Sequence, residues 1–445
     1  MVTGSAKAFL AQECVNLQAV LEETLRFKYG LEGSEEFFEE CQSRLRFIAS
    51  EIAGANDSDF DSLQGACSLL AGLSDLVSRI ERSSIGEYSW PFVEELKQIA
   101  IAMCTEATAA NPNTPPQVHV LCAGGLDAYA IQPEVRRPSG SAKRIHTIVL
   151  PRTLKHFVLL HSILGHEVGH AMLRCSKHQQ ALIDIFQREL FANTVFADPL
   201  ATAKWIYSPT APNRVKSSLG APQLAARGVN QGKFFPTIAS WPAWIEEVMC
   251  DFIGLLTFGP SFVAAECNLL YAADPSASGL GPRHPPVGCR ANYLLSAAVL
   301  SGDAFTAFDS EALELSAEAF WSKLSTRKQP DPWFNVFPDN QIRKTVEALS
   351  ALLSPLVPAL YPKPTEDDLG LLLDQVTMLI PPVGFQVGRL HTMCWHKIDF
   401  RHVLYAGWIA SATRPDIPFM VLNRLCEHGI MQQRAINIEL GASKR

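Results

Sequence analysis

The chain has 445 residues, of which 47% are hydrophobic and 19% charged, which excludes a disordered or low-complexity protein and leaves room for two or three domains. Its net charge of −7 gives no global electrostatic reason to bind nucleic acid or an anionic membrane. No apolar stretch is long enough to span a membrane, the N-terminus lacks the zones of a secretory signal, and the 11 cysteines follow no disulfide spacing. These features predict a cytoplasmic protein with reduced thiols.

The first 110 residues predict a bundle of amphipathic helices. Apolar residues recur three and four positions apart in four segments, 6–29, 34–52, 58–80 and 90–107. In the first segment, Gly30 ends a helix whose apolar stripe contains Phe9, Leu10, Leu17, Leu21 and Leu25. Four such helices favour an N-terminal helical bundle over 1–110, with the stripes as its core.

The periodicity changes after the proline-rich break at 111–116. Three short segments, 118–122, 128–132 and 144–150, are typical of strands, and Gly124 with Gly125 is expected to join the first two as a hairpin. Helices are expected at 153–175, at 241–258 with Ser240 as N-cap, at 291–300 and at 311–323. Residues 111–325 are therefore expected to form a central domain with a small sheet among helices.

A second boundary is expected at 328–340, where proline and aspartate recur, and it opens a C-terminal helical region over 326–445. In this region Thr365 and Asp368 have the spacing of a helix-capping pair. The whole chain is thus expected to be mainly α (α+β). Residues 204–233 contain lysines and arginines but no acid, which is typical of a solvated loop. The alternatives are a lid over a cleft and a surface that receives an acidic partner.

The segment His166-Glu167-Val168-Gly169-His170 carries the strongest chemical signal. Residues four apart share one face of a helix, so both imidazoles can bind one small cation, and zinc accepts such ligands. Glu167, one position along, is placed to reach a water on that ion as a general base. Burying these polar groups in an apolar helix is costly unless they meet a partner. Gly169 costs the helix about 1 kcal/mol against alanine, which makes sense if another element packs closely there.

A third ligand is expected in the next polar helix. Glu247 and Asp251 lie four apart on one face, surrounded by apolar residues. Glu247 would complete a His₂Glu set and leave the fourth position to water, while Asp251 would accept a hydrogen bond from the free nitrogen of a ligand histidine. Glu246 is the alternative ligand, but it has no carboxylate four residues further on. His284 precedes two prolines that hold its backbone extended, and such a rigid histidine beside a metal can stabilise an oxyanion.

Taken together and in order, these segments resemble the gluzincin peptidases of the CAAX prenyl protease and HtpX type. The shared motifs are His166-Glu167-x-x-His170, Glu247-x-x-x-Asp251 and His284-Pro-Pro-x-x-x-Arg290, spread over roughly a third of the chain. The resemblance implies a zincin-like catalytic domain with zinc at the two histidines and Glu247, and Asp251 as support for a ligand. It also implies a transition-state role for His284, and support of the fold or the site by Arg290.

Two features depart from that family. Its members are often embedded in a membrane, whereas this chain has no apolar spanning segment, and Cys250 stands where a small alanine is usual before the aspartate. The first departure argues against a membrane substrate. The second introduces a thiol that could compete as a zinc ligand.

The sequence therefore predicts a soluble zinc-dependent endopeptidase that acts on a protein or peptide, with Glu167 as general base toward a zinc-activated water. The alternatives are a catalytically inactive zinc-binding scaffold that binds a partner, and a zinc amidase on the same fold. An open fourth metal position favours catalysis, whereas Cys250 closing it favours a structural site. The helical flanks are expected to select the substrate or to receive a regulatory partner.

Overall fold

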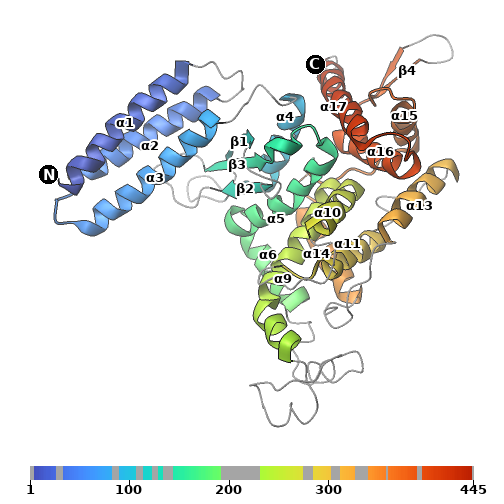
Figure 1. Ribbon diagram of the computed structural model, residues 1–445, viewed down its shortest axis with the longest axis horizontal. Helices are drawn as coiled ribbons and strands as arrows, with labels where there is room; N and C mark the ends of the chain where they lie inside the picture. The colour runs from blue at the N-terminus through green and yellow to red at the C-terminus, as the bar shows by residue number, and fades with distance from the viewer. Residues whose placement is uncertain are drawn as a thin grey trace. The chain divides into compact units, whose positions relative to one another are not determined.

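The computed structural model describes residues 5–26, 34–82, 90–106, 114–122, 129–133, 144–191, 231–273, 284–301, 311–325, 339–356, 359–387 and 393–442 (Figure 1). Its contacts divide the chain into two compact units. The first unit contains Met1–Tyr88 and Thr105–Lys155, and the second contains Ser89–Cys104 and His156–Arg445. The protein is mainly helical with small sheets, as the sequence predicts.

The helices of the first unit are α1 (Ala6–Arg26), α2 (Ser34–Gly54) and α3 (Phe60–Arg82). They pack on one another through the predicted apolar stripes, which form a continuous buried core that includes Leu10, Leu17, Leu45 and Leu70. Phe9 departs from its predicted stripe, because its side chain is 64% exposed. The position lies one residue beyond the 100°-wide face that the neighbouring helices cover.

The fourth predicted helix, α4 (Trp90–Met103), belongs by its contacts to the second unit. It packs against the C-terminal helix α17 (Phe419–Ala442) and against α5 (Leu164–Cys175). The bundle expected over 1–110 thus has three of its helices in the first unit. Helical periodicity shows which face of α4 is buried but not which partner covers it.

The sheet of the first unit contains β1 (Gln117–Cys122), β2 (Ala130–Pro133) and β3 (Ile145–Leu150) in the order β1-β3-β2. β1 runs parallel to β3, and β2 runs antiparallel to it. The expected hairpin between the first two strands is therefore wrong, because β3 lies between them; Gly124 and Gly125 themselves lie outside the described residues. All six residues of β3 are buried, and so apolar a strand takes the centre of the sheet.

The helix expected after the third strand is divided, and its first turn, up to Lys155, still belongs to the first unit. Residues expected as one helix over 153–175 form the short 3-10 helices η2 (Arg152–Leu154) and η3 (Val158–Ile163), and α-helix starts only at α5. The helix α6 (Gln179–Ile185) and the π-helix η4 (Phe186–Phe191) follow. The next helix, α9, runs over Gln231–Phe258, so the expected cap Ser240 lies inside it. A serine marks a cap only locally, and helices tolerate it elsewhere.

Further helices build the rest of this unit: α10 (Pro260–Ala273), α11 (Val287–Leu300), α13 (Glu311–Ser325), α14 (Asp339–Leu353), α15 (Glu366–Thr377) and α16 (Phe400–Thr413). The capping pair is confirmed, since the Asp368 amide donates to Thr365 Oγ1 over 3.1 Å. A two-stranded sheet, β4 (Phe385–Val387) with β5 (Met393–Trp395), interrupts the helices expected here.

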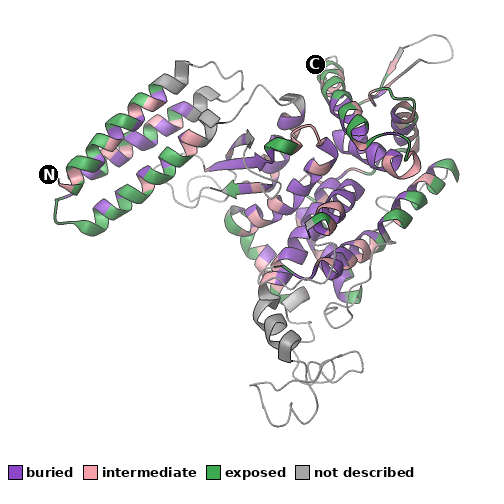
Figure 2. Cartoon of the chain, in the orientation of Figure 1, coloured by how far each residue is buried: buried purple, intermediate pink, exposed green. Residues whose placement is uncertain are grey.

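The core of the second unit lies around α10, α16 and the C-terminal half of α9, whose residues are mostly buried (Figure 2). In α16 every residue from Phe400 to Ala410 is buried. Within the described part of the chain, no helix combines the length and apolar character that crossing a membrane needs.

Candidate metal centre

Two helices of the second unit, α5 and α9, approach each other through residues without bulky side chains. A Cβ atom on Gly169 would lie 2.8 Å from the Cα of Cys250, and one on Gly165 would lie 2.9 Å from the Cα of Gly254. Both distances are too short for any side chain. The close neighbour that Gly169 predicts is therefore present, and it is α9.

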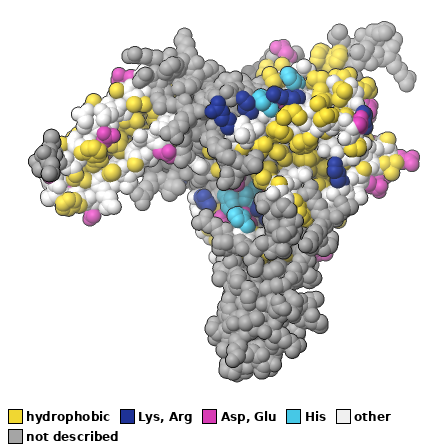
Figure 3. All heavy atoms as spheres, in the orientation of Figure 1, with side chains coloured by type: hydrophobic (Ala, Val, Ile, Leu, Met, Phe, Trp, Pro, Cys, Tyr) yellow, Lys and Arg dark blue, Asp and Glu magenta, His cyan; other side chains and the backbone are white. Residues whose placement is uncertain are grey.

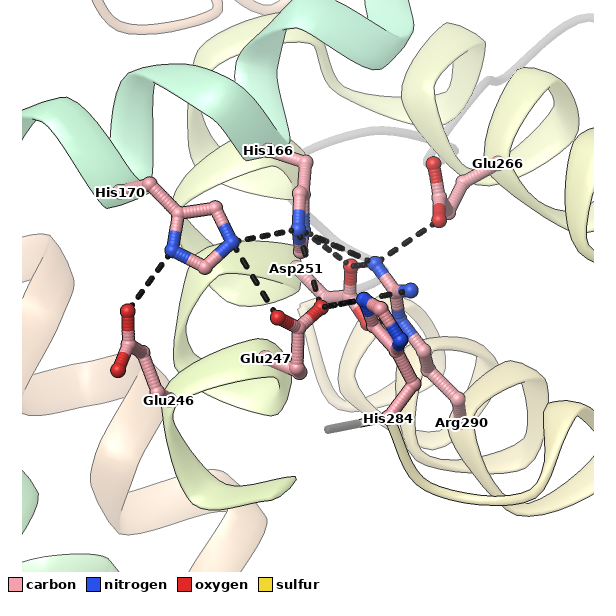
Figure 4. Close-up of polar contacts among 8 residues, drawn as sticks. All are labelled: His166, His170, Glu246, Glu247, Asp251, Glu266, His284 and Arg290. Atoms are coloured by element: carbon pink, nitrogen blue, oxygen red, sulfur yellow. Dashed lines mark hydrogen bonds and ion pairs between the residues drawn. The ribbon is translucent and has the colours of Figure 1, made fainter. Parts of the chain in front are cut away.

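This close packing brings His166 and His170 of α5 together with Glu247 of α9 (Figure 4). One possible ligand atom from each residue lies within 4.8 Å of the other two. The two Nε2 atoms are 3.1 Å apart, and the Glu247 carboxylate lies 3.2 Å from His166 Nε2 and 3.3 Å from His170 Nε2. The three side chains named as metal ligands from the sequence thus converge on one point.

The second nitrogen of each histidine faces a carboxylate. His166 Nδ1 lies 2.9 Å from Asp251 Oδ1, and His170 Nδ1 lies 2.9 Å from Glu246 Oε1. An ionised carboxylate only accepts hydrogen bonds, so each Nδ1 carries a proton and donates it. In the neutral imidazoles, each Nε2 is then left with a lone pair aimed at the other and at Glu247. Such a convergence of acceptors could hold a cation at its centre.

The charges of this cluster support the same conclusion. Burial opposes a charged imidazole and Arg290 adds to this, yet Asp251 and Glu247 outweigh both and raise the pKa of His166 to about 10. Burial likewise opposes charge on His170, but Cys250, Glu246 and Glu247 raise its pKa. Without a metal, both rings attract a second proton, and two Nε2–H groups would then face each other over 3.1 Å.

A divalent cation would remove this conflict, because the two lone pairs and the carboxylate oxygen could all bind it. Two imidazoles and a carboxylate are a ligand set typical of catalytic zinc. Glu247 Oε2 is buried and has no hydrogen-bond donor among the described residues, which leaves it free for such an ion. The residues present therefore fit zinc.

Arg290 is buried within the cluster and joins its acids. Its Nε and Nη2 donate to the two oxygens of Asp251 over 2.6 and 2.7 Å, and its Nη1 lies 3.6 Å from Glu247 Oε2. Arg290 thus holds Asp251, the carboxylate that accepts from His166. Burial works against the charged guanidinium, but Asp251 and Glu266 raise its pKa well above the ordinary value.

Sequence reasoning missed two acids of this cluster. Glu246, considered only as an alternative ligand, instead accepts from His170, and this contact lowers its pKa. Glu266 of α10 pairs with Arg290 over 2.9 Å and matches no motif. The signal for Glu266 was its place in an apolar helix, since a buried acid needs a partner.

The two residues predicted to act in catalysis lie around the histidine pair. His284 Nε2 is 3.5 Å from Glu247 Oε2, and its side chain is 58% exposed. Glu167 is half-buried on α5, and its carboxylate forms no hydrogen bond or ion pair with another residue of the described ranges. Figure 3 shows a group of histidine side chains on this face of the molecule. Of the centre's own residues, His284 is the most exposed, whereas His166 and Glu247 are buried.

The weaker candidates do not join the centre. Cys250 neighbours His170, but it is not part of the three-ligand group. Two further histidines precede α5 and contact other residues: the rings of His161 and Phe92 have centroids 5.4 Å apart, and His156 pairs with Glu427. Residues 204–230 of the basic stretch lie outside the described residues.

Compared with protein-family models, curated proteins and solved structures, the chain gives no match. The metal centre therefore rests on the geometry of its own residues.

Proposed function

We propose that this protein is a zinc-dependent peptidase with the metal held by His166, His170 and Glu247. The observation that carries the proposal is the convergence of three ligand atoms within 4.8 Å, with both outer imidazole nitrogens already fixed by carboxylates. Structural metal sites use such supports too. What favours catalysis is that a three-ligand set leaves one position for water or substrate.

When bound, zinc would supply Lewis-acid chemistry, polarising a carbonyl and making water a stronger acid. Glu167 would take the proton of the attacking water at its carboxylate and pass it to the leaving amine. This assignment is supported by its place between the two histidines and by the absence of a competing hydrogen bond in the described residues. His284, at the exposed side of Glu247, would donate to the developing oxyanion.

The resemblance to the CAAX prenyl protease and HtpX type remains part of this proposal. Its three motifs fall on α5, on α9 and at the start of α11, and their side chains meet in one cluster. We extend the proposal to a zincin-like domain around these helices and to a protein or peptide substrate. The cysteines whose side chains the structure describes are free thiols, which supports a cytoplasmic location.

The test separates metal binding from turnover. Purified wild type, Glu167→Gln and His170→Ala would be analysed for zinc by mass spectrometry and for cleavage of casein and of a peptide library. Glu318→Gln on the exposed face of α13 is the matched control. We expect Glu167→Gln to keep one zinc and lose at least about 100-fold in kcat. His170→Ala should lose both the zinc and the activity. Cleavage by Glu167→Gln at the wild-type rate would show that another group is the base.

The same samples test the alternatives. A protein that binds zinc but cleaves no peptide, and whose cobalt-substituted form shows the strong thiolate absorption of a Cys250 ligand, would be a structural or scaffold site. Hydrolysis of small amides without cleavage of peptides would indicate an amidase. Removing zinc with 1,10-phenanthroline should abolish the activity in either enzyme, and added zinc should restore it.

A further inference from the structure

Glu266 is a buried acid whose only recorded partner among the described residues is Arg290. It lies on α10, is 2% exposed, and its Oε1 is 2.9 Å from Arg290 Nη2. Its second oxygen, Oε2, is buried without a hydrogen-bond partner in the described part of the chain. A buried acid costs folding free energy unless it is paired, and Arg290 provides the pairing. The question is what this acid does for Arg290.

Arg290 faces two carboxylates of the metal centre that compete for it. Asp251 accepts from Nε and Nη2 over 2.6 and 2.7 Å, whereas Glu247 Oε2 is 3.6 Å from Nη1. Nη2 also lies 3.0 and 3.4 Å from the two nitrogens of His166, distances that only a position over the ring face allows. A small movement of the guanidinium toward Glu247 would turn the longer contact into a charge-assisted hydrogen bond.

Such a movement would block the metal, because Glu247 Oε2 is one of the oxygens that face the histidine pair. Asp251 and Glu247 both lie on α9, and both are within reach of the guanidinium. Glu266 approaches from α10, and its bond to Nη2 pulls the guanidinium to the side away from Glu247 (Figure 4).

We propose that Glu266 is a positioning residue of the metal centre: it holds Arg290 on Asp251 and keeps it off Glu247, so that the ligand oxygen stays free for zinc. The inference rests on the metal-binding part of the proposed function and not on peptidase activity. Removing Glu266 should let Arg290 pair with Glu247. Disturbing the groups that surround a metal ligand typically weakens metal binding by about 10-fold to 100-fold. Glu266 would act on the ligand Glu247 in this way through Arg290.

The test is the zinc affinity of purified full-length variants, measured by competition with a chromophoric chelator, together with the visible spectrum of the Co²⁺-substituted protein. We expect Glu266→Ala to raise the zinc Kd about 10-fold to 100-fold and to shift the cobalt bands. Glu266→Gln keeps the size and one acceptor oxygen, so it should hold Arg290 in part, raise the Kd less, and retain the wild-type spectrum.

Glu427 provides the matched control. It is also a buried glutamate of the second unit, and it pairs with His156 and Arg424 away from the metal centre. Glu427→Ala should lower the unfolding temperature of the metal-free protein as Glu266→Ala does, yet leave the zinc Kd within twofold of wild type. The zinc Kd is measured on folded protein. If Glu266 had a purely structural role, Glu266→Ala would therefore lower the unfolding temperature and leave the zinc Kd unchanged.

Several results would overturn the inference. One is an unchanged zinc Kd and cobalt spectrum in both Glu266 variants. Another is a loss of zinc affinity in Glu427→Ala as large as that in Glu266→Ala. A wild-type protein that binds no zinc would overturn both this inference and the proposed function. Zinc binding without cleavage of any peptide would overturn only the peptidase, and the Glu266 effect on Kd would still be expected.

Discussion

Gly169 of α5 lies so close to Cys250 of α9 that a Cβ atom on the glycine would be 2.8 Å from the cysteine Cα. Four residues earlier, Gly165 meets Gly254 in the same way. These two contacts set the spacing of the helices, and the spacing places His166 and His170 within reach of Glu247. The geometry of the candidate metal centre is therefore controlled by residues outside its ligand group.

Gly169→Ala should separate the two helices. The added methyl group meets backbone, which cannot rotate away, so we expect a loss of about 1–3 kcal/mol in unfolding free energy and a large rise in the zinc Kd. Urea unfolding and chelator competition measure the two effects. Gly72→Ala on α3 is the control, because a Cβ there meets nothing within 4 Å. Gly72→Ala should raise the free energy of unfolding by about 0.5–1 kcal/mol. If Gly169→Ala raised it in the same way, the packing argument would be refuted.

Asp251→Asn and Glu246→Gln should weaken zinc binding to different extents. Asp251 is buried and holds both His166 and Arg290, so its replacement by the amide should raise the zinc Kd about 10-fold to 100-fold. Glu246 is 40% exposed, and glutamine keeps an oxygen for His170, so that change should stay below about 10-fold. Calorimetric titration with zinc gives both values. An equal loss in the two variants would contradict the ranking.

His146 should make the first unit sensitive to acid. It is fully buried in β3, and burial, followed by the charge of Arg144, lowers its pKa from 6.5 to about 4. The unfolded chain therefore binds the proton first, so stability is unaffected above pH 7 and falls as the pH drops from about 6.5 to about 4. The full effect of this pKa difference is about 3 kcal/mol. His146→Gln should lose this pH dependence in urea unfolding, and parallel curves for the two proteins would exclude His146 as its source.

Leu379 should be a position where glycine stabilises the protein. It follows the C-cap of α15 and has a φ of +63°, and the amide of Ile380 donates to the carbonyl of Gln375 over 2.8 Å. Glycine usually occupies this position. The side chain is 54% exposed, so little packing is lost on its removal. We expect Leu379→Gly to raise the free energy of unfolding by about 1 kcal/mol, because the relief of left-handed strain exceeds the chain entropy that glycine adds to the unfolded state. Met378→Gly, at a φ of −86°, should destabilise instead, and thermal unfolding distinguishes the two.

The sequence alone determined the local features, because these depend on residues close together along the chain. The stripes of α1 to α3, the cap at Thr365, the shared face of His166 and His170 and the close approach at Gly169 all follow from spacing within one helix. Glu247 and Asp251 could also be predicted from the sequence as site residues, since an acidic pair in an apolar helix indicates a buried polar site.

Tertiary structure decided what lies between distant segments. β3 separates β1 from β2, which adjacency in sequence does not indicate, and α4 takes its partners from the second unit. Glu246 faces His170, and Glu266 reaches Arg290 from a separate helix, α10, only because helix rotation and crossing bring them there. Helical periodicity fixes which face a residue occupies, but the identity of the group opposite depends on packing of the whole core, where contacts join residues far apart in the chain.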